Sequence, residues 1–114
     1  MGQMTDRGAA GLLLRTLLNE SAQPEVRSLV VTGLEPRDMF QVEYMMILAA
    51  AQALHRAGKP IDLESLESEL APKDPAAFAR IVLRSVYENR LAGPTGVEDV
   101  KELVNFLVGF RDQP

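Results

Sequence analysis

Few side chains of this 114-residue sequence are of a type that does acid–base or metal chemistry. His55 is the one histidine, so a metal motif that needs two histidines is excluded. No cysteine occurs, which removes thiolate metal ligands, thiol nucleophiles and disulfides. A catalytic triad would have to use His55, and the G-x-S-x-G turn that presents a nucleophilic serine is missing. We therefore expect His55 to be a surface residue near a helix C-terminus.

Four carboxylates lie close together in a short acidic segment, at Asp62, Glu64, Glu67 and Glu69. Carboxylates bind hard cations, but no histidine or asparagine completes a coordination set in this segment. Helical spacing predicts that the glutamates face solvent, away from the leucines between them. The sequence also lacks the G-K-S/T end of a phosphate-binding loop. We therefore expect no metal site, no cofactor and no catalytic constellation in this chain.

Three arginines, Arg80, Arg84 and Arg90, leave two interpretations open: contact with an acidic partner, or the charged outer face of a helix. Nucleic-acid binding is disfavoured, because it needs clustered cations and the net charge here is −4. A helix-turn-helix built from the segments after Asp62 and Pro75 is disfavoured too. Its first helix would be acidic and its linker holds two prolines. We expect no direct contact with nucleic acid.

Apolar residues recur at helical spacing along nearly the whole sequence, which predicts an all-α fold. We expect a compact bundle of about six helices around a long central helix. The predicted helices cover about 12–19, 24–33, 35–57, 62–70, 75–90 and 97–110. The third is the longest and is apolar on most of its circumference, which is typical of a helix buried on several sides.

Helix ends are marked by short local signals. Gly33 and Gly58 are predicted to end the second and third helices, because glycine enters the left-handed conformation easily. Asp62 is predicted to cap the fourth helix, and Asp74, with proline directly after it, to cap the fifth. Thr95 has capping-box spacing to a glutamate at the start of the last helix.

Composition predicts one globular domain over residues 1–114, with 46% hydrophobic and 25% charged residues. Residues 1–7 are expected to be a flexible start or a remnant of cloning. They lack the basic and apolar regions of a secretion signal. The longest apolar run, residues 45–51, is far shorter than the roughly 20 residues that span a bilayer. We expect a soluble, cytoplasmic protein that does not contact a membrane.

The last helix, residues 97–110, carries more apolar side chains than one face holds. Its broad apolar face comprises Val97, Val100, Leu103, Val104, Leu107 and Val108. Phe106 and Phe110, one turn apart, lie partly outside that face. Either the domain covers the whole helix, or the phenylalanines are offered to another chain. The partner-binding residues that we predict are Leu103, Phe106, Leu107 and Phe110.

Three stretches of the sequence resemble one known helical domain. They read Asp38-Met39-Phe40, Gly58-Lys59-Pro60-Ile61-Asp62-Leu63 with Leu66 and Leu70, and Leu12-Leu13-Leu14-Arg15-Thr16-Leu17-Leu18. This domain is shared by the C-terminal helicase-interaction domain of the bacterial primase DnaG and the N-terminal domain of the replicative helicase DnaB. The resemblance covers about residues 8–110.

Two features make the chain more similar to the primase form. The segment 8–14 lacks the acidic residue and the glycine of the A-E-x-x-x-L-G opening of the helicase form. The segment 72–78 leads directly into the fifth helix, without the G-G-x-x-Y-L sequence of the helicase form.

The resemblance implies a protein-interaction domain of the bacterial replication machinery, which docks on the replicative helicase at the fork. Primer synthesis would then belong to other domains. One alternative is the N-terminal domain of a DnaB-type helicase, with roles in oligomerisation and primase binding. Another is an unrelated helical adaptor or regulatory domain. The implied partners are a replicative helicase, a primase or further copies of the chain.

Overall fold

Six α-helices and three short 3₁₀ helices make up the computed structural model, which describes residues 6–111. The α-helices are α1 (Asp6–Leu18), α2 (Pro24–Gly33), α3 (Val42–Arg56), α4 (Leu63–Leu70), α5 (Phe78–Glu88) and α6 (Val97–Arg111). The 3₁₀ helices are η1 (Pro36–Met39), η2 (Ala71–Lys73) and η3 (Arg90–Ala92). The described part of the chain contains no strand, so the predicted all-α fold is confirmed.

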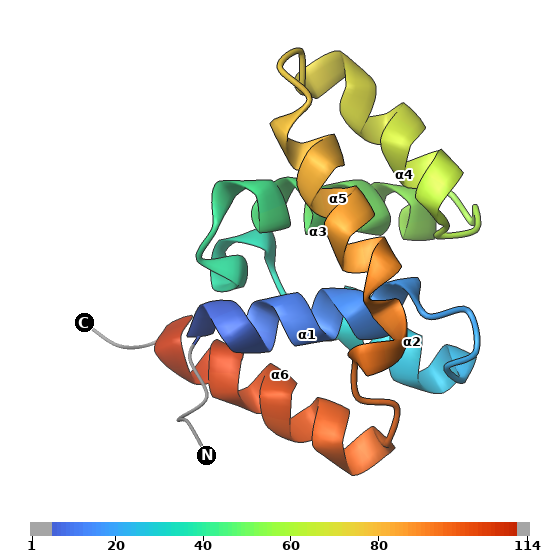
Figure 1. Cartoon of the computed structure of the whole chain (residues 1–114). Coiled ribbons are helices and arrows are strands. Elements are labelled where there is room, and N and C mark those ends of the chain that lie inside the picture. Colours follow the sequence, from blue (N-terminus) through green and yellow to red (C-terminus); the bar gives the residue numbers. More distant parts are fainter. Residues whose placement is uncertain (1–5, 112–114) are drawn as a thin grey trace.

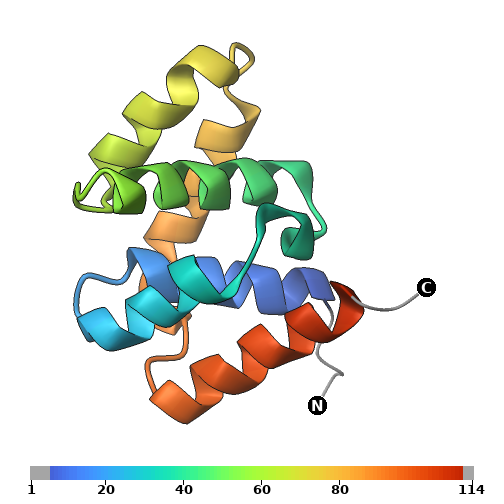
Figure 2. The same ribbon diagram turned by 180° about the vertical axis from the view of Figure 1, so that it is seen from behind.

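The six helices form two groups of three. In the first group α1, α2 and α6 contact one another, and in the second α3, α4 and α5 do. Figure 1 shows α6 beneath α1, with α5 running from the second group down to α1. Figure 2, seen from behind, shows α2 (cyan) in front of α1, on the side of α1 that faces away from the viewer in Figure 1. One apolar core runs through both groups.

Helix α1 is the most buried of the six. It contacts α2, α3, α5 and α6, and its Leu13, Leu14 and Leu17 have no exposed surface. The predicted central helix, α3, contacts four helices as well, but Val42 and Ala49 on its surface are exposed. The leucine-rich helix α1 therefore shares the central position with α3.

The segment predicted as one helix over 35–57 is divided. Pro36 to Met39 form η1, and Phe40 then takes the left-handed conformation with φ 63°. Because this conformation is incompatible with a continuous right-handed helix, α3 starts only at Val42. The prediction of an uninterrupted helix was wrong at its N-terminal end.

The end of α3 has the predicted form. Gly58 has φ 69°, its amide donates to the carbonyl of His55 at 3.1 Å, and the Lys59 amide donates to Leu54 at 2.9 Å. These two bonds define a Schellman motif, which satisfies the last carbonyls of the helix. Four residues later the carboxylate of Asp62 accepts from the amide of Ser65 at 2.8 Å and caps α4.

Helix α5 starts later than predicted. Its first residue is Phe78, and Ala77 before it is left-handed with φ 63°. Asp74 still caps the helix, since its carboxylate accepts from the amides of Ala79 at 3.2 Å and Arg80 at 3.0 Å. Asp74 therefore caps α5 although it lies four residues before Phe78, with a turn between them. The later start follows from the left-handed backbone of Ala77, which a continuous right-handed helix cannot include.

The connection between α5 and α6 packs on the backbone of α1. The hydroxyl of Thr16 donates to the carbonyl of Pro94 at 2.6 Å. A Cβ atom at Gly93 would lie 2.7 Å from the amide nitrogen of Thr16, so only glycine fits there. The carbonyl of Gly96 accepts from the amide of Val100 at 3.0 Å, which makes Gly96, and not Thr95, the N-cap residue of α6.

Two predictions concern the chain as a whole. Of the start expected to be flexible, residues 1–5 lie outside the described residues, whereas Asp6 is already part of α1. Within the residues described here, no helix is both long enough and apolar enough to cross a membrane.

Candidate functional site

Three phenylalanine rings form an exposed cluster where η1 meets the end of α6. The rings of Phe40 and Phe110 lie 5.5 Å apart at 87°, and those of Phe106 and Phe110 lie 5.2 Å apart at 89°. Both are edge-to-face contacts, the arrangement that the ring quadrupoles favour. Phe40 is 40% exposed and Phe106 is 37% exposed. We call these three residues the aromatic cluster.

The backbone places the three rings. Phe106 and Phe110 are four residues apart on α6, which puts them on the same side of the helix. Phe40 reaches them from the connection between η1 and α3, where its left-handed backbone turns the chain. A bulky residue in this conformation costs about 1–2 kcal/mol. The surrounding contacts must offset that cost, as is typical of backbone outliers at functional sites.

An ion-pair network lies beside the aromatic cluster and joins α6 to η1. Arg111 donates from Nε to the Asp38 carboxylate at 3.0 Å and from Nη2 to its second oxygen. The same Nε lies 3.2 Å from the carboxylate of Glu35. Asp38 in turn accepts from the amide of Glu35 at 2.7 Å, which completes a capping box on η1. The end of α6 is therefore fixed to the segment that carries Phe40.

Asp38 is buried, and its ionisation depends on this network. Burial alone would raise its pKa. The hydrogen bond from Arg111, the Glu35 amide and the charges of Arg111 and Arg37 outweigh burial, so the pKa lies below its usual value of 3.8. Asp38 is thus charged at neutral pH, and its charge is neutralised inside the protein.

A small recess opens between the aromatic cluster and the network. It has a volume of about 210 Å³ and is lined by Arg37, Asp38, Phe40, Phe110 and Arg111. Phenylalanine and arginine are among the residue types enriched in protein interfaces. Exposed rings beside charged side chains give this surface both apolar and polar groups.

The four partner-binding residues predicted from the sequence have different surroundings. Phe106 is exposed, and Phe110 and Leu103 are partly buried. Leu107 has no exposed surface and belongs to the core, so it cannot contact a partner directly. Phe40 was not predicted, because its contact with Phe110 joins residues 70 positions apart and leaves no local signal.

The three arginines that might have met an acidic partner are paired within the chain. Arg80 lies 3.2 Å from Asp74, Arg84 lies 2.8 Å from Glu67, and Arg90 lies 2.7 Å from Glu20 (nitrogen to oxygen in each case). The interpretation as charged outer faces of helices therefore fits the structure better.

The remaining candidates from the sequence are His55 and the acidic side chains considered as metal ligands. His55 is exposed near the C-terminus of α3, as predicted. Among the described residues, no group of three or more histidine, aspartate or glutamate side chains could hold a metal ion.

No family model, no curated protein sequence and no solved structure matches this chain. The resemblance to the helical replication domain therefore stays a prediction from the residues that carry it.

Proposed function

We propose that this chain is a protein-interaction domain of the bacterial DNA replication machinery, which docks on a replicative helicase through the aromatic cluster. The observation that carries the docking role is the exposure of Phe40 and Phe106 around Phe110. The resemblance of the Asp38–Phe40 and Gly58–Leu63 segments to the primase domain is what directs the proposal to the helicase.

Three features of the aromatic cluster support a docking role. Aromatic side chains supply large contact areas, and burial of their exposed apolar parts favours association. The rings come from two segments that the Arg111–Asp38 contact ties together, so they present one continuous surface. Arg37, which is exposed and lies 2.6 Å (nitrogen to oxygen) from the Glu35 carboxylate, adds a polar group at the rim.

The proposal is tested with the full chain and the replicative helicase and primase of its source organism. Each partner is immobilised, and binding is measured by surface plasmon resonance. We expect saturable binding to the helicase and a rise of about tenfold or more in Kd for Phe106→Ala, the cost typical of a residue central to an interface.

Phe78→Ala is the matched control. Phe78 is a phenylalanine on α5 that is 66% exposed and is no part of the aromatic cluster. This variant should bind the helicase like the parent chain. Equal losses for the two variants would contradict the docking surface.

The identity of the binding partner decides among the alternatives. Binding to primase, or self-association without helicase binding, would assign the chain to the helicase-like form. Binding to neither protein would overturn the replication role and leave an unrelated helical adaptor.

A further inference from the structure

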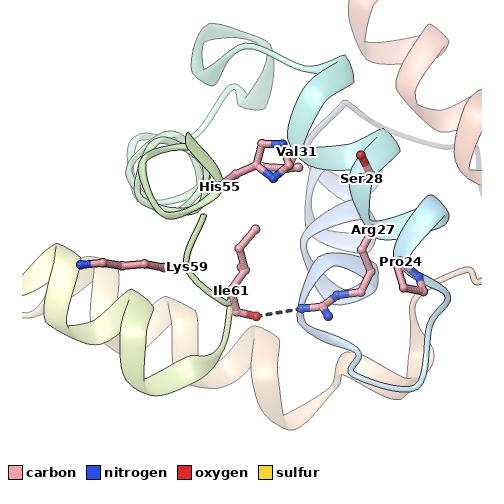
Figure 3. A pocket seen from close by; sticks show the side chains of 7 residues that line it. All are labelled: Pro24, Arg27, Ser28, Val31, His55, Lys59 and Ile61. Atoms are coloured by element: carbon pink, nitrogen blue, oxygen red, sulfur yellow. Dashed lines mark hydrogen bonds between the residues drawn. The ribbon is translucent and has the colours of Figure 1, made fainter. Parts of the chain in front are cut away.

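A second recess lies at the other end of α3, between that helix, α2 and the turn after Gly58 (Figure 3). Its volume is about 320 Å³, at the lower end of the range for ligand clefts. The residues that line it are Pro24, Arg27, Ser28, Val31, His55, Lys59 and Ile61. We call it the α2–α3 recess.

Arg27 is held in a fixed position in the wall of the α2–α3 recess. Its Nε donates to the carbonyl of Leu17 at 2.9 Å and its Nη2 to the carbonyl of Ile61 at 2.8 Å, the bond drawn in Figure 3. A guanidinium has five N–H donors, and these bonds use two of them. Both partners are neutral carbonyls, so the positive charge of Arg27 is not cancelled by them. Arg27 also lines a neighbouring recess together with Glu20, Asp62 and Glu64.

The charge of the α2–α3 recess is opposite to that of the whole protein. The chain has 16 acidic and 12 basic residues, yet none of the seven lining residues is acidic. Arg27 and Lys59 are cations, and Ser28 and His55 add polar groups. Lys59 extends away from the recess in Figure 3, so Arg27 is the cation of the lining that stays beside it. A lining that has cationic side chains and no carboxylate favours an anionic ligand.

Apolar side chains form the rest of the lining. Pro24 is exposed and Ile61 is partly buried, so both offer apolar surface to a ligand, whereas Val31 is almost fully buried. A purely ionic ligand would leave the apolar surface of Pro24 and Ile61 uncovered. A ligand with one apolar group flanked by negative charges would satisfy both kinds of wall.

We propose that the α2–α3 recess binds an acidic peptide segment of a partner protein, with one leucine or phenylalanine side chain inserted. In this arrangement the apolar side chain packs on Pro24 and Ile61, the apolar lining residues that are not fully buried. A neighbouring carboxylate accepts hydrogen bonds from the remaining N–H groups of Arg27, since the guanidinium fork matches a carboxylate.

The α2–α3 recess is separate from the aromatic cluster. The two lie at opposite ends of α3, whose 15 residues span about 22 Å at 1.5 Å per residue. The recess and the aromatic cluster share no residue. A failure at this recess would therefore leave the docking role of the aromatic cluster unaffected, and the reverse also holds.

The test uses fluorescent eight-residue peptides with the full chain. Each peptide carries one central leucine or phenylalanine among glutamates and aspartates. Fluorescence anisotropy measures affinity, and ¹⁵N NMR locates the site. We expect saturable binding that weakens as salt is added, with the largest shifts at the amides of Ser28, Val31 and His55. Peptides with glutamine in place of each acidic residue should bind at least about tenfold more weakly.

His55→Glu and Arg56→Glu form a matched pair of variants. Both residues are exposed neighbours at the end of α3, but only His55 lines the α2–α3 recess. We expect His55→Glu to weaken binding about tenfold and Arg56→Glu to weaken it less, although the second change alters the net charge more. An equal or larger effect of Arg56→Glu, or no amide shifts around the recess, would overturn the proposal.

Discussion

The guanidinium of Arg111 hydrogen-bonds to the buried carboxylate of Asp38 across 73 positions of the chain. The contact ties the last turn of α6 to η1, directly beside the Phe40–Phe110 ring pair. The ion pair therefore also helps to hold the aromatic cluster together.

Removal of the arginine should destabilise the fold. Arg111→Met leaves the Asp38 carboxylate buried without its main partner, which should lower the free energy of unfolding by about 2–3 kcal/mol. Urea denaturation at pH 7 measures the change. Lys101→Met is the control, because Lys101 is an exposed residue of α6 whose contact with Glu98 is long, at 3.7 Å. It should change stability by about 0.5 kcal/mol or less.

The same pair predicts a dependence on pH. The pKa of Asp38 is lower in the folded protein than in the unfolded chain, so its charged form stabilises the fold. That stabilisation is complete above the unfolded value of 3.8 and is lost as the pH falls further through the lowered pKa. Urea denaturation of Asp38→Asn from pH 7 to pH 2 should show a smaller loss of stability on acidification than the parent chain. An identical acid dependence would show that Asp38 is not responsible.

Two neighbouring residues of α6 should lose different amounts of folding stability on truncation. Leu107→Ala creates a cavity in the core and should cost about 2–5 kcal/mol of folding stability. Phe106→Ala removes a ring that is 37% exposed and should cost clearly less. Thermal denaturation followed by circular dichroism ranks the two. The reverse order would mean that Leu107, and not Phe106, faces outward.

Two glycines provide a test of the packing around α6. Gly93→Ala places a methyl group 2.7 Å from the Thr16 amide nitrogen and 2.9 Å from the Cβ of Arg15. We expect a loss of about 1–3 kcal/mol in the free energy of unfolding, because the α5–α6 connection must move. Gly109→Ala meets no atom within 4 Å and lies in α6. It should stabilise the protein by about 0.5–1 kcal/mol.

Ala77 should be a position where glycine is better than alanine. Its φ of 63° is unfavourable for a residue with a Cβ atom. Ala77→Gly relieves that strain at the cost of a more flexible unfolded chain, so a gain of roughly 0.5 kcal/mol is expected. Ala76→Gly, one residue earlier and without a positive φ, should lose a similar amount. Chemical denaturation measures the free energy of unfolding of both variants. A lower value for both would rule out strain at Ala77.

Helix ends that depend on local chemistry could be predicted from the sequence. The stop at Gly58 and the cap at Asp62 involve residues within five positions of each other, so the sequence contains the whole interaction. The six helices follow from apolar spacing in the same way. Local signals failed at Phe40 and Ala77, whose backbones are left-handed although neither residue is glycine or asparagine. At Phe40 this conformation accompanies a contact with the distant Phe110.

The candidate site could be predicted only in part. Helical periodicity placed Phe106 and Phe110 at the edge of the apolar face of α6, and both take part in the aromatic cluster. Periodicity does not show how far neighbouring elements cover that face, so it could not separate buried Leu107 from exposed Phe106. Phe40 and Arg27 owe their roles to contacts between distant segments, which no single helix pattern contains.

Helix α6 is anchored at both ends, by the Thr16–Pro94 hydrogen bond before it and by the Arg111–Asp38 pair at its last turn. An anchored helix has little conformational entropy left to lose when another protein covers it. A partner that docks on the aromatic cluster would therefore keep most of the free energy gained by burying the phenylalanine rings. Cutting either anchor should weaken such a complex even though no contact with the partner is removed.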